Sequence, residues 1–260
     1  MEDEILKQTQ IANWQFPIEV WNCLSDYEKS FVKNEFTSNR SLDYYSNHLI
    51  SLGFNNLDCV LDAACGMGQW SIALAGLNKH ITGIDINMER LLVANEISKS
   101  HNIQNCVFRY GSIEQIPYPN SSFDGIFCYG AFMFTDMLKT LQEFHRVLKP
   151  NGRLYLNANS AGWYAHLLWD IGVRNKNYQM IKTVIRSAVR TLRGRSSNRI
   201  VSRKWLKSQL INMNFELIDI TEEGKININP IQSRPESCYP SRFYGMTSII
   251  EVIAKRKEES

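Results

Sequence analysis

The chain has 260 residues, of which 44% are hydrophobic and 21% are charged, and its formal net charge is +3. These proportions are typical of globular proteins and exclude disordered, collagen-like and disulfide-scaffold proteins. No apolar stretch reaches the roughly 18 to 20 residues that a membrane span needs, and the acidic start of the chain is unlike a signal peptide, so we expect a cytoplasmic protein. The six scattered cysteines form no CxxC pair and have no histidine at zinc-ligand spacing, so we expect no metal site.

The first 55 residues have a helical pattern, with a helix predicted over Ser41 to Leu52 that ends at Gly53. From Asp58 onward, short β-branched and apolar runs alternate with helical stretches, which is typical of βαβ units and a parallel sheet. Strands are predicted at 59–63, 80–85, 104–110, 123–129 and 153–157, with helices at 69–77, 88–101 and 135–148.

A mostly helical insertion follows the fifth strand, and two more strands, at 215–221 and 246–255, are expected to pair antiparallel at the sheet edge. The predicted fold class is therefore α/β, with a Rossmann-like, seven-stranded, mostly parallel sheet and helices on both faces. The predicted domains are an N-terminal helical lid or support (1–55), a Rossmann-like core (56–158), a helical insertion (159–213) and C-terminal edge strands (214–260).

The most informative segment is the glycine turn VLDAACGMGQW at residues 60–70, a strand that runs into a turn and then a helix. Such a turn offers backbone N–H groups and a helix N-terminus to a ligand. A dinucleotide-binding turn would have a third glycine where this chain has Ser71, and Asp62 would repel a pyrophosphate but attract a cationic ligand. Asp85 ends the next strand, where a carboxylate can accept both hydrogen bonds of a ribose diol. Either acid alone could equally be a helix-entry cap.

Four ordered blocks resemble the class I S-adenosylmethionine-dependent methyltransferases, especially those that act on small molecules. They are LDAACGMG at 61–68, GSIEQIPY at 111–118, SFDGI at 122–126 and EFHRVLKPNGRL at 143–154, and the resemblance covers about residues 55 to 158. It implies S-adenosyl-L-methionine as the cofactor and S-adenosyl-L-homocysteine as the product.

The resemblance also implies a role for individual residues. Gly66 and Gly68 would let the backbone approach the methionine and ribose parts, and Asp62 would lie near the ammonium group. Asp85 would hold the ribose hydroxyls. Many relatives have Asp where this chain has Ser112, whose uncharged hydroxyl would accept the adenine amino hydrogen bond. The residues expected at the cofactor are Asp62, Ala64, Gly66, Gly68, Asp85, Ile86, Ser112, Ile113 and Tyr129.

The acceptor pocket is expected to be mostly apolar with a few polar groups. After the fourth strand the chain reads CYGAF, unlike the Asn/Asp-Pro-Pro-Tyr/Phe of relatives that methylate exocyclic amino groups, which disfavours that chemistry. His166 is the expected general base, because a histidine can accept a proton near neutral pH. The expected aromatic lining is Tyr45, Phe132, Trp163 and Tyr164, although core packing is the simpler explanation for any one of them.

Positive charge is concentrated in residues 171–215, which contain seven Arg and four Lys but no Asp or Glu. Lys182, Arg186, Arg190 and Arg193 share one face of a predicted helix. A solvated helix face explains the spacing, but the absence of acidic partners favours an anionic partner. This partner would be a phosphorylated or carboxylated acceptor near Arg186 and Arg190, an anionic membrane surface contacted through 178–207, or RNA.

Three functional hypotheses follow. The preferred one is methyl transfer to a small-molecule or saccharide-like acceptor, with O-methylation favoured over N-methylation. The alternative is an RNA methyltransferase that uses the basic insertion for phosphate contacts, which the acidic balance of the remaining chain and the lack of a recognisable RNA-binding module disfavour. A non-catalytic cofactor-binding scaffold is disfavoured by the intact glycine turn and both acids.

Overall fold

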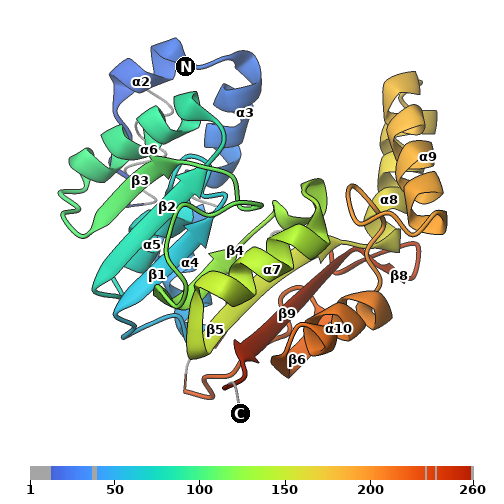
Figure 1. Cartoon of the computed structure of the whole chain (residues 1–260). Coiled ribbons are helices and arrows are strands. Elements are labelled where there is room, and N and C mark those ends of the chain that lie inside the picture. Colours follow the sequence, from blue (N-terminus) through green and yellow to red (C-terminus); the bar gives the residue numbers. More distant parts are fainter. Residues whose placement is uncertain (1–12, 37–39, 232, 238, 259–260) are drawn as a thin grey trace. The chain divides into compact units, whose positions relative to one another are not determined.

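The structure is a computed structural model that describes residues 13–36, 40–231, 233–237 and 239–258 (Figure 1). Part of the predicted N-terminal lid, residues 1–12 and 37–39, lies outside the described residues. The chain forms two compact units. The first contains residues 1–112 and 228–235, and the second contains residues 113–227 and 236–260.

Among the described residues, three helices precede the sheet strands of the first unit. Ser25 and Ser41 begin two of them, because each serine side chain accepts a hydrogen bond from the backbone N–H three residues further on. Gly53 follows the last helix in the left-handed conformation, with a φ of 70°, which confirms the predicted helix end. The helices are α2 (Ile18–Cys23), α3 (Asp26–Glu35) and α4 (Leu42–Ser51).

The sheet strands of the first unit are parallel and connected by helices, as the βαβ pattern predicts. In the paired register, Ala63 lies beside Ile84, and Asp85 lies beside Tyr110. The third strand begins at Cys106, two residues later than predicted. The elements are β1 (Cys59–Ala63), α5 (Gln69–Ala75), β2 (His80–Asp85), α6 (Met88–Ser100) and β3 (Cys106–Tyr110).

In the seven-stranded sheet, the second unit contributes one parallel pair of strands and two antiparallel pairs. Strand β4 is parallel to β5, whereas β9 is antiparallel to both β5 and β6, which confirms the predicted antiparallel edge. The order across the seven-stranded sheet is β3-β2-β1-β4-β5-β9-β6, so the predicted fold class is confirmed. The new elements are β4 (Phe123–Cys128), η2 (Phe132–Phe134), α7 (Met137–Val147), β5 (Leu148–Asn159), β6 (Phe215–Glu222) and β9 (Ile249–Arg256).

The insertion after β5 is helical, as predicted, and it includes one π-helical segment. Its elements are α8 (Ala161–His166), the π-helical η3 (Leu167–Val173), α9 (Tyr178–Leu192) and α10 (Arg203–Asn212). The strand predicted at 246–255 was wrong in one respect. A hairpin of β7 (Arg242–Phe243) and β8 (Met246–Thr247) precedes β9, because Tyr244 and Gly245 turn the chain with positive φ values.

Two glycines make room for one aromatic ring beneath the glycine turn. A Cβ atom on Gly83 in β2 would lie 2.7 Å from Cδ1 of Phe108 and 2.9 Å from Sγ of Cys65. A Cβ atom on Gly68 would lie 3.0 Å from Cζ of the same ring. Phe108 on β3 therefore packs against both the turn and β2, and this contact is only available to glycine.

We predict that Gly83→Ala lowers the free energy of unfolding by about 1 to 3 kcal/mol, because the added methyl group overpacks the contact with Phe108 and Cys65. Urea denaturation followed by circular dichroism measures this loss. Gly76→Ala is the matched control, since Gly76 has a helical φ of −69° and an added Cβ would be in ordinary van der Waals contact, 3.6 Å from the carbonyl oxygen of Ala73. Equal unfolding midpoints for the two variants would contradict the prediction.

Candidate functional site

The glycine turn connects β1 to α5 through three residues with positive φ. These are Ala64 at 63°, Gly66 at 56° and Gly68 at 84°. The turn is tied to β2 by the Cys65 N–H, which donates to the Ile84 carbonyl at 2.9 Å. A Cβ atom on Gly66 would meet no protein atom within 4 Å, so this position leaves the backbone accessible to a ligand. At Gly68 the missing Cβ also makes room for the ring of Phe108.

Asp85, the last residue of β2, holds the turn through its side chain. Its Oδ2 accepts a hydrogen bond from the Gly66 N–H at 2.9 Å, and its Oδ1 accepts one from the Asn87 N–H at 2.8 Å. Each carboxylate oxygen retains a second lone pair, so these bonds are compatible with binding a diol. The next side chain, Ile86, is 69% exposed and offers an apolar surface beside the carboxylate.

Asp62 in β1 is a buried carboxyl group beneath the same turn, with only 2% of the residue exposed. The Ser71 hydroxyl donates to its Oδ2 at 2.5 Å. The pKa of Asp62 is raised to about 7, chiefly by burial; the hydrogen bond from Ser71 lowers it, and the negative charge of Asp85 adds to the increase. The ionised form of Asp62 is therefore costly unless a cation is near, so the group favours a positively charged ligand.

The remaining predicted cofactor residues occupy different surroundings. Ser112 is half-buried and ends the first unit, while Ile113 is buried and begins the second. Tyr129 is half-buried after β4, where its hydroxyl donates to Oε1 of Glu223 and its ring stacks on Phe127 with centroids 6.2 Å apart. Sequence reasoning did not identify Glu223, because it lies 94 residues further along the chain and in no recognisable motif.

His166, the predicted base, is paired with a carboxylate. Its Nδ1 lies 2.8 Å from Oδ2 of Asp170, which also accepts a hydrogen bond from the Tyr244 hydroxyl at 2.7 Å. The bonds from Tyr244 and His166 hold the pKa of Asp170 below its usual range, so this carboxylate stays ionised. The imidazole ring stacks on Phe243 with centroids 4.3 Å apart. Asp170 thereby orients the ring and can hold a proton on Nδ1, leaving Nε2 to accept one.

The predicted acceptor-side aromatics divide into two groups. Tyr45 and Phe132 are fully buried, each in the core of its own unit, and the Tyr45 hydroxyl donates to Oε2 of Glu35 at 2.7 Å. Tyr164 is also buried. Trp163 is half-buried beside the imidazole of His166, with ring centroids 5.8 Å apart. Trp163 is thus the member of the set that the structure brings together with the predicted base.

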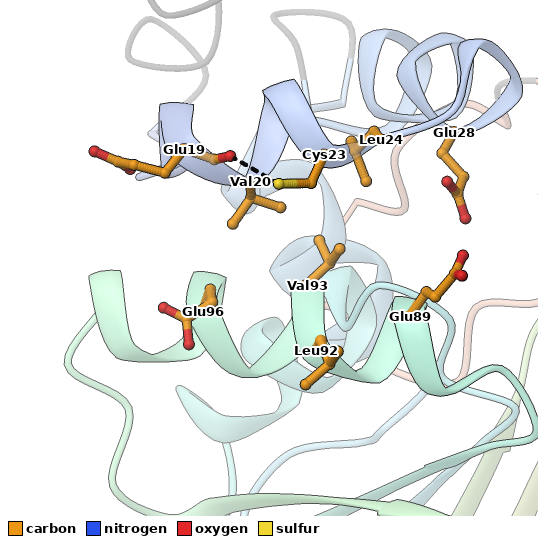
Figure 2. Close-up of a pocket in the computed structure, with 9 residues that line it drawn as sticks. All are labelled: Glu19, Val20, Cys23, Leu24, Glu28, Glu89, Leu92, Val93 and Glu96. Atoms are coloured by element: carbon orange, nitrogen blue, oxygen red, sulfur yellow. Dashed lines mark hydrogen bonds between the residues drawn. The ribbon is translucent and has the colours of Figure 1, made fainter.

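The first unit also contains a cavity of about 500 Å³ where α2 and α3 face α6 (Figure 2). Its lining is apolar in the centre and carries several carboxylates. The lining residues are Glu19, Val20, Cys23, Leu24, Glu28, Glu89, Leu92, Val93 and Glu96. None of them belongs to the predicted cofactor set, and the Glu28 carboxylate already caps α3. The cavity is therefore separate from the glycine turn in its residues.

The fold and the glycine turn together define the class of S-adenosylmethionine-dependent class I methyltransferases. Residues 55–191, more than half of the chain, match the model of a family described as a methyltransferase domain, and the chain belongs to this family.

Relatives and solved structures support this membership. A demethylmenaquinone methyltransferase from Listeria welshimeri is 35% identical over 112 residues, which are 40% of this chain and 48% of that protein. The chain thus spans about half the length of the curated relatives it matches. The crystal structure of YcgJ from Bacillus subtilis has a TM-score of 0.55 at 21% identity, covering 84% of this chain and 100% of that chain. Geranyl diphosphate methyltransferase in complex with SAM has a TM-score of 0.61 at 14% identity, covering 85% and 87%. At these identities the two structures show the shared fold.

We predict that Gly66→Ala weakens binding of S-adenosylhomocysteine at least about tenfold in calorimetry, while the protein stays folded. The added methyl group would point into space open to a ligand, and the left-handed backbone would cost only about 1 kcal/mol. Gly194→Ala is the matched control, because Gly194 has a similar φ of 68° and also has no protein atom within 4 Å of an added Cβ. Equal affinities of the two variants would show that the turn does not approach the ligand.

Asp62 generates a pH-dependent prediction. A carboxyl group whose folded pKa is raised stabilises the fold below its unfolded pKa, near 4, and this contribution is lost as the pH rises through about 7. Without ligand, Asp62→Asn should therefore be more stable than the wild type at about pH 8, by about 1 to 4 kcal/mol, with the advantage shrinking towards pH 4.

Chemical denaturation across this pH range measures the effect, and the exposed Asp26→Asn variant is the control. An advantage of Asp62→Asn that does not change with pH would contradict the raised pKa.

Proposed function

We propose that this chain transfers a methyl group from S-adenosylmethionine to a hydroxyl oxygen of a small-molecule acceptor, with His166 as the general base. The observation that carries the choice of oxygen is the pairing of His166 with Asp170. A hydroxyl acceptor gains from a positioned base, whereas a neutral amine needs none to attack. When bound, S-adenosylmethionine supplies the electrophilic methyl group.

The residues around the glycine turn fit this cofactor. The buried Asp62 favours a positive charge and suits the ammonium group of the methionine part. Asp85 retains acceptor capacity for the ribose hydroxyls, and the exposed Ile86 offers an apolar surface to the adenine. Gly66 lets a ligand approach the backbone closely. These assignments use only residues that the structure places in and next to the turn.

The acceptor chemistry is assigned to the second unit. We expect Nε2 of His166 to take the proton of the acceptor hydroxyl as the new oxygen–carbon bond forms. The ionised Asp170 would stabilise the imidazolium that results, because it lies against Nδ1 at 2.8 Å. The aromatic faces of Trp163 and Phe243 beside this imidazole favour an acceptor that contains a ring, either aromatic or saccharide-like.

Transfer of labelled methyl groups tests the proposal, with extracted metabolites and RNA offered separately. Label in a small molecule supports it, label in RNA supports the alternative, and cofactor binding without transfer to either would support a scaffold.

With the acceptor identified, we predict that His166→Gln lowers kcat about 100-fold or more, because the acceptor hydroxyl loses the group that takes its proton, while the cofactor Kd is unchanged. Asp170→Asn should lower kcat by a smaller factor, because it acts through the imidazole. His80→Gln, which changes an exposed histidine, is the control. A His166→Gln enzyme with wild-type kcat would assign the base elsewhere.

A further inference from the structure

Helix α9 packs on the protein through one side only. Val184 and Ser187 are its buried residues, and the helix approaches η3 closely at Gly172. A Cβ atom on Gly172 would lie 2.8 Å from Cγ1 of Ile181, so this glycine permits the contact. The opposite side of α9 faces away from the segment on which it packs.

That outer side carries a stripe of exposed apolar side chains. Tyr178 is 71% exposed, Ile185 54%, Val189 38% and Leu192 87%. Their spacing of seven, four and three residues keeps all four on one side of the helix. Trp169 in the neighbouring η3 is also exposed. Four exposed apolar residues on one side of a 15-residue helix cost free energy in water unless something covers them.

A stripe of cations runs directly beside the apolar stripe. Lys182, Arg186, Arg190 and Arg193 are all exposed and are spaced four, four and three residues apart. Residues 171–215 contain no Asp or Glu, and within the described part of the chain no ion pair neutralises these four cations. The outer side of α9 therefore combines apolar and positively charged surface in adjoining strips.

We propose that this face of α9 docks on the surface of an anionic lipid bilayer. An interfacial helix of this kind places its apolar side chains at the boundary of the acyl chains and its cations among the phosphates. Tyr178 and Trp169 belong to the residue types that favour the membrane interface. None of the described helices is long and apolar enough to cross a membrane, so the contact is in the plane of the surface.

Charge complementarity selects this occupant over two others. A second copy of the chain would set the same cations against one another, which opposes pairing through this face. RNA would pair with the cations, but the exposed aliphatic side chains of Ile185, Val189 and Leu192 gain nothing from a phosphate backbone. An anionic lipid surface offers apolar contacts to the first stripe and phosphate groups to the second. This inference does not rest on methyl transfer, and its test measures binding alone.

Cosedimentation of the full chain with vesicles tests the proposal. At about 0.15 M salt we expect binding to vesicles of equal parts phosphatidylglycerol and phosphatidylcholine, and at least tenfold weaker binding to pure phosphatidylcholine. The triple variant R186Q/R190Q/R193Q should lose at least tenfold in affinity for the anionic vesicles. The double variant I185S/L192S keeps every cation, and it should also bind more weakly, with the remaining binding abolished by about 1 M salt.

The matched control is R203Q/K204Q/K207Q, which removes the same charge from the exposed surface of α10. It should retain most of the binding. If both triple variants lost vesicle affinity equally, or if I185S/L192S bound like the wild type, the binding would be general charge attraction. Either result would overturn docking through α9. Absence of vesicle binding, preferential binding to an RNA oligonucleotide, or self-association that the I185S/L192S change abolishes would each overturn it as well.

Discussion

A single carboxylate, that of Asp85, joins the end of β2 to the turn that follows β1. It accepts hydrogen bonds from the N–H groups of Gly66 and Asn87, so both connections leave their strands from one polar anchor. The Gly66 N–H lies in the turn, outside the strand ladder, and a partly buried donor without a partner is costly. The conformation of the turn, the exposure of Ile86 and the accessibility of Gly66 all depend on this anchor.

Burial of negative charge then determines what the turn can accept. Asp62 and Asp85 lie at or near the carboxyl ends of adjacent parallel strands, and the negative charge of Asp85 adds to the burial that raises the pKa of Asp62. The Ser71 hydroxyl donates one hydrogen bond to the Asp62 carboxyl group but brings no positive charge to it. Both carboxyl groups are buried, so this region of the turn favours a positively charged group and opposes a phosphate. A dinucleotide-binding turn also connects a strand to a helix through glycines, but it binds a pyrophosphate, which the negative charge of these acids would oppose.

Local signals in the sequence were sufficient for most of the architecture. The serine at position 41, the strands at 59–63 and 80–85 and the antiparallel edge were all predicted, because caps, apolar runs and turns depend on neighbours in sequence. The features that were not predicted depend on contacts between distant segments. Phe108 beneath the two glycines, Glu223 on the Tyr129 hydroxyl and Tyr244 on Asp170 each join residues that no pattern relates. The separation of β8 from β9 was missed because the apolar run continues across Ser248, which bonds back to Ser241.

Gly172 limits how the amino-acid sequence of the insertion can change during evolution. The outer residues of α9 make few contacts with the rest of their unit, so their identities can drift without disturbing the core. Helix α9 lies so close to η3 at Gly172, however, that an added Cβ would be 2.8 Å from Cγ1 of Ile181 and 3.2 Å from the Leu167 carbonyl oxygen. A methyl group at position 172 would therefore disturb the packing of this 15-residue helix on η3, whereas changes on its outer side would leave that packing intact. Chemical specificity and placement of α9 are thus encoded at separate positions and can evolve independently.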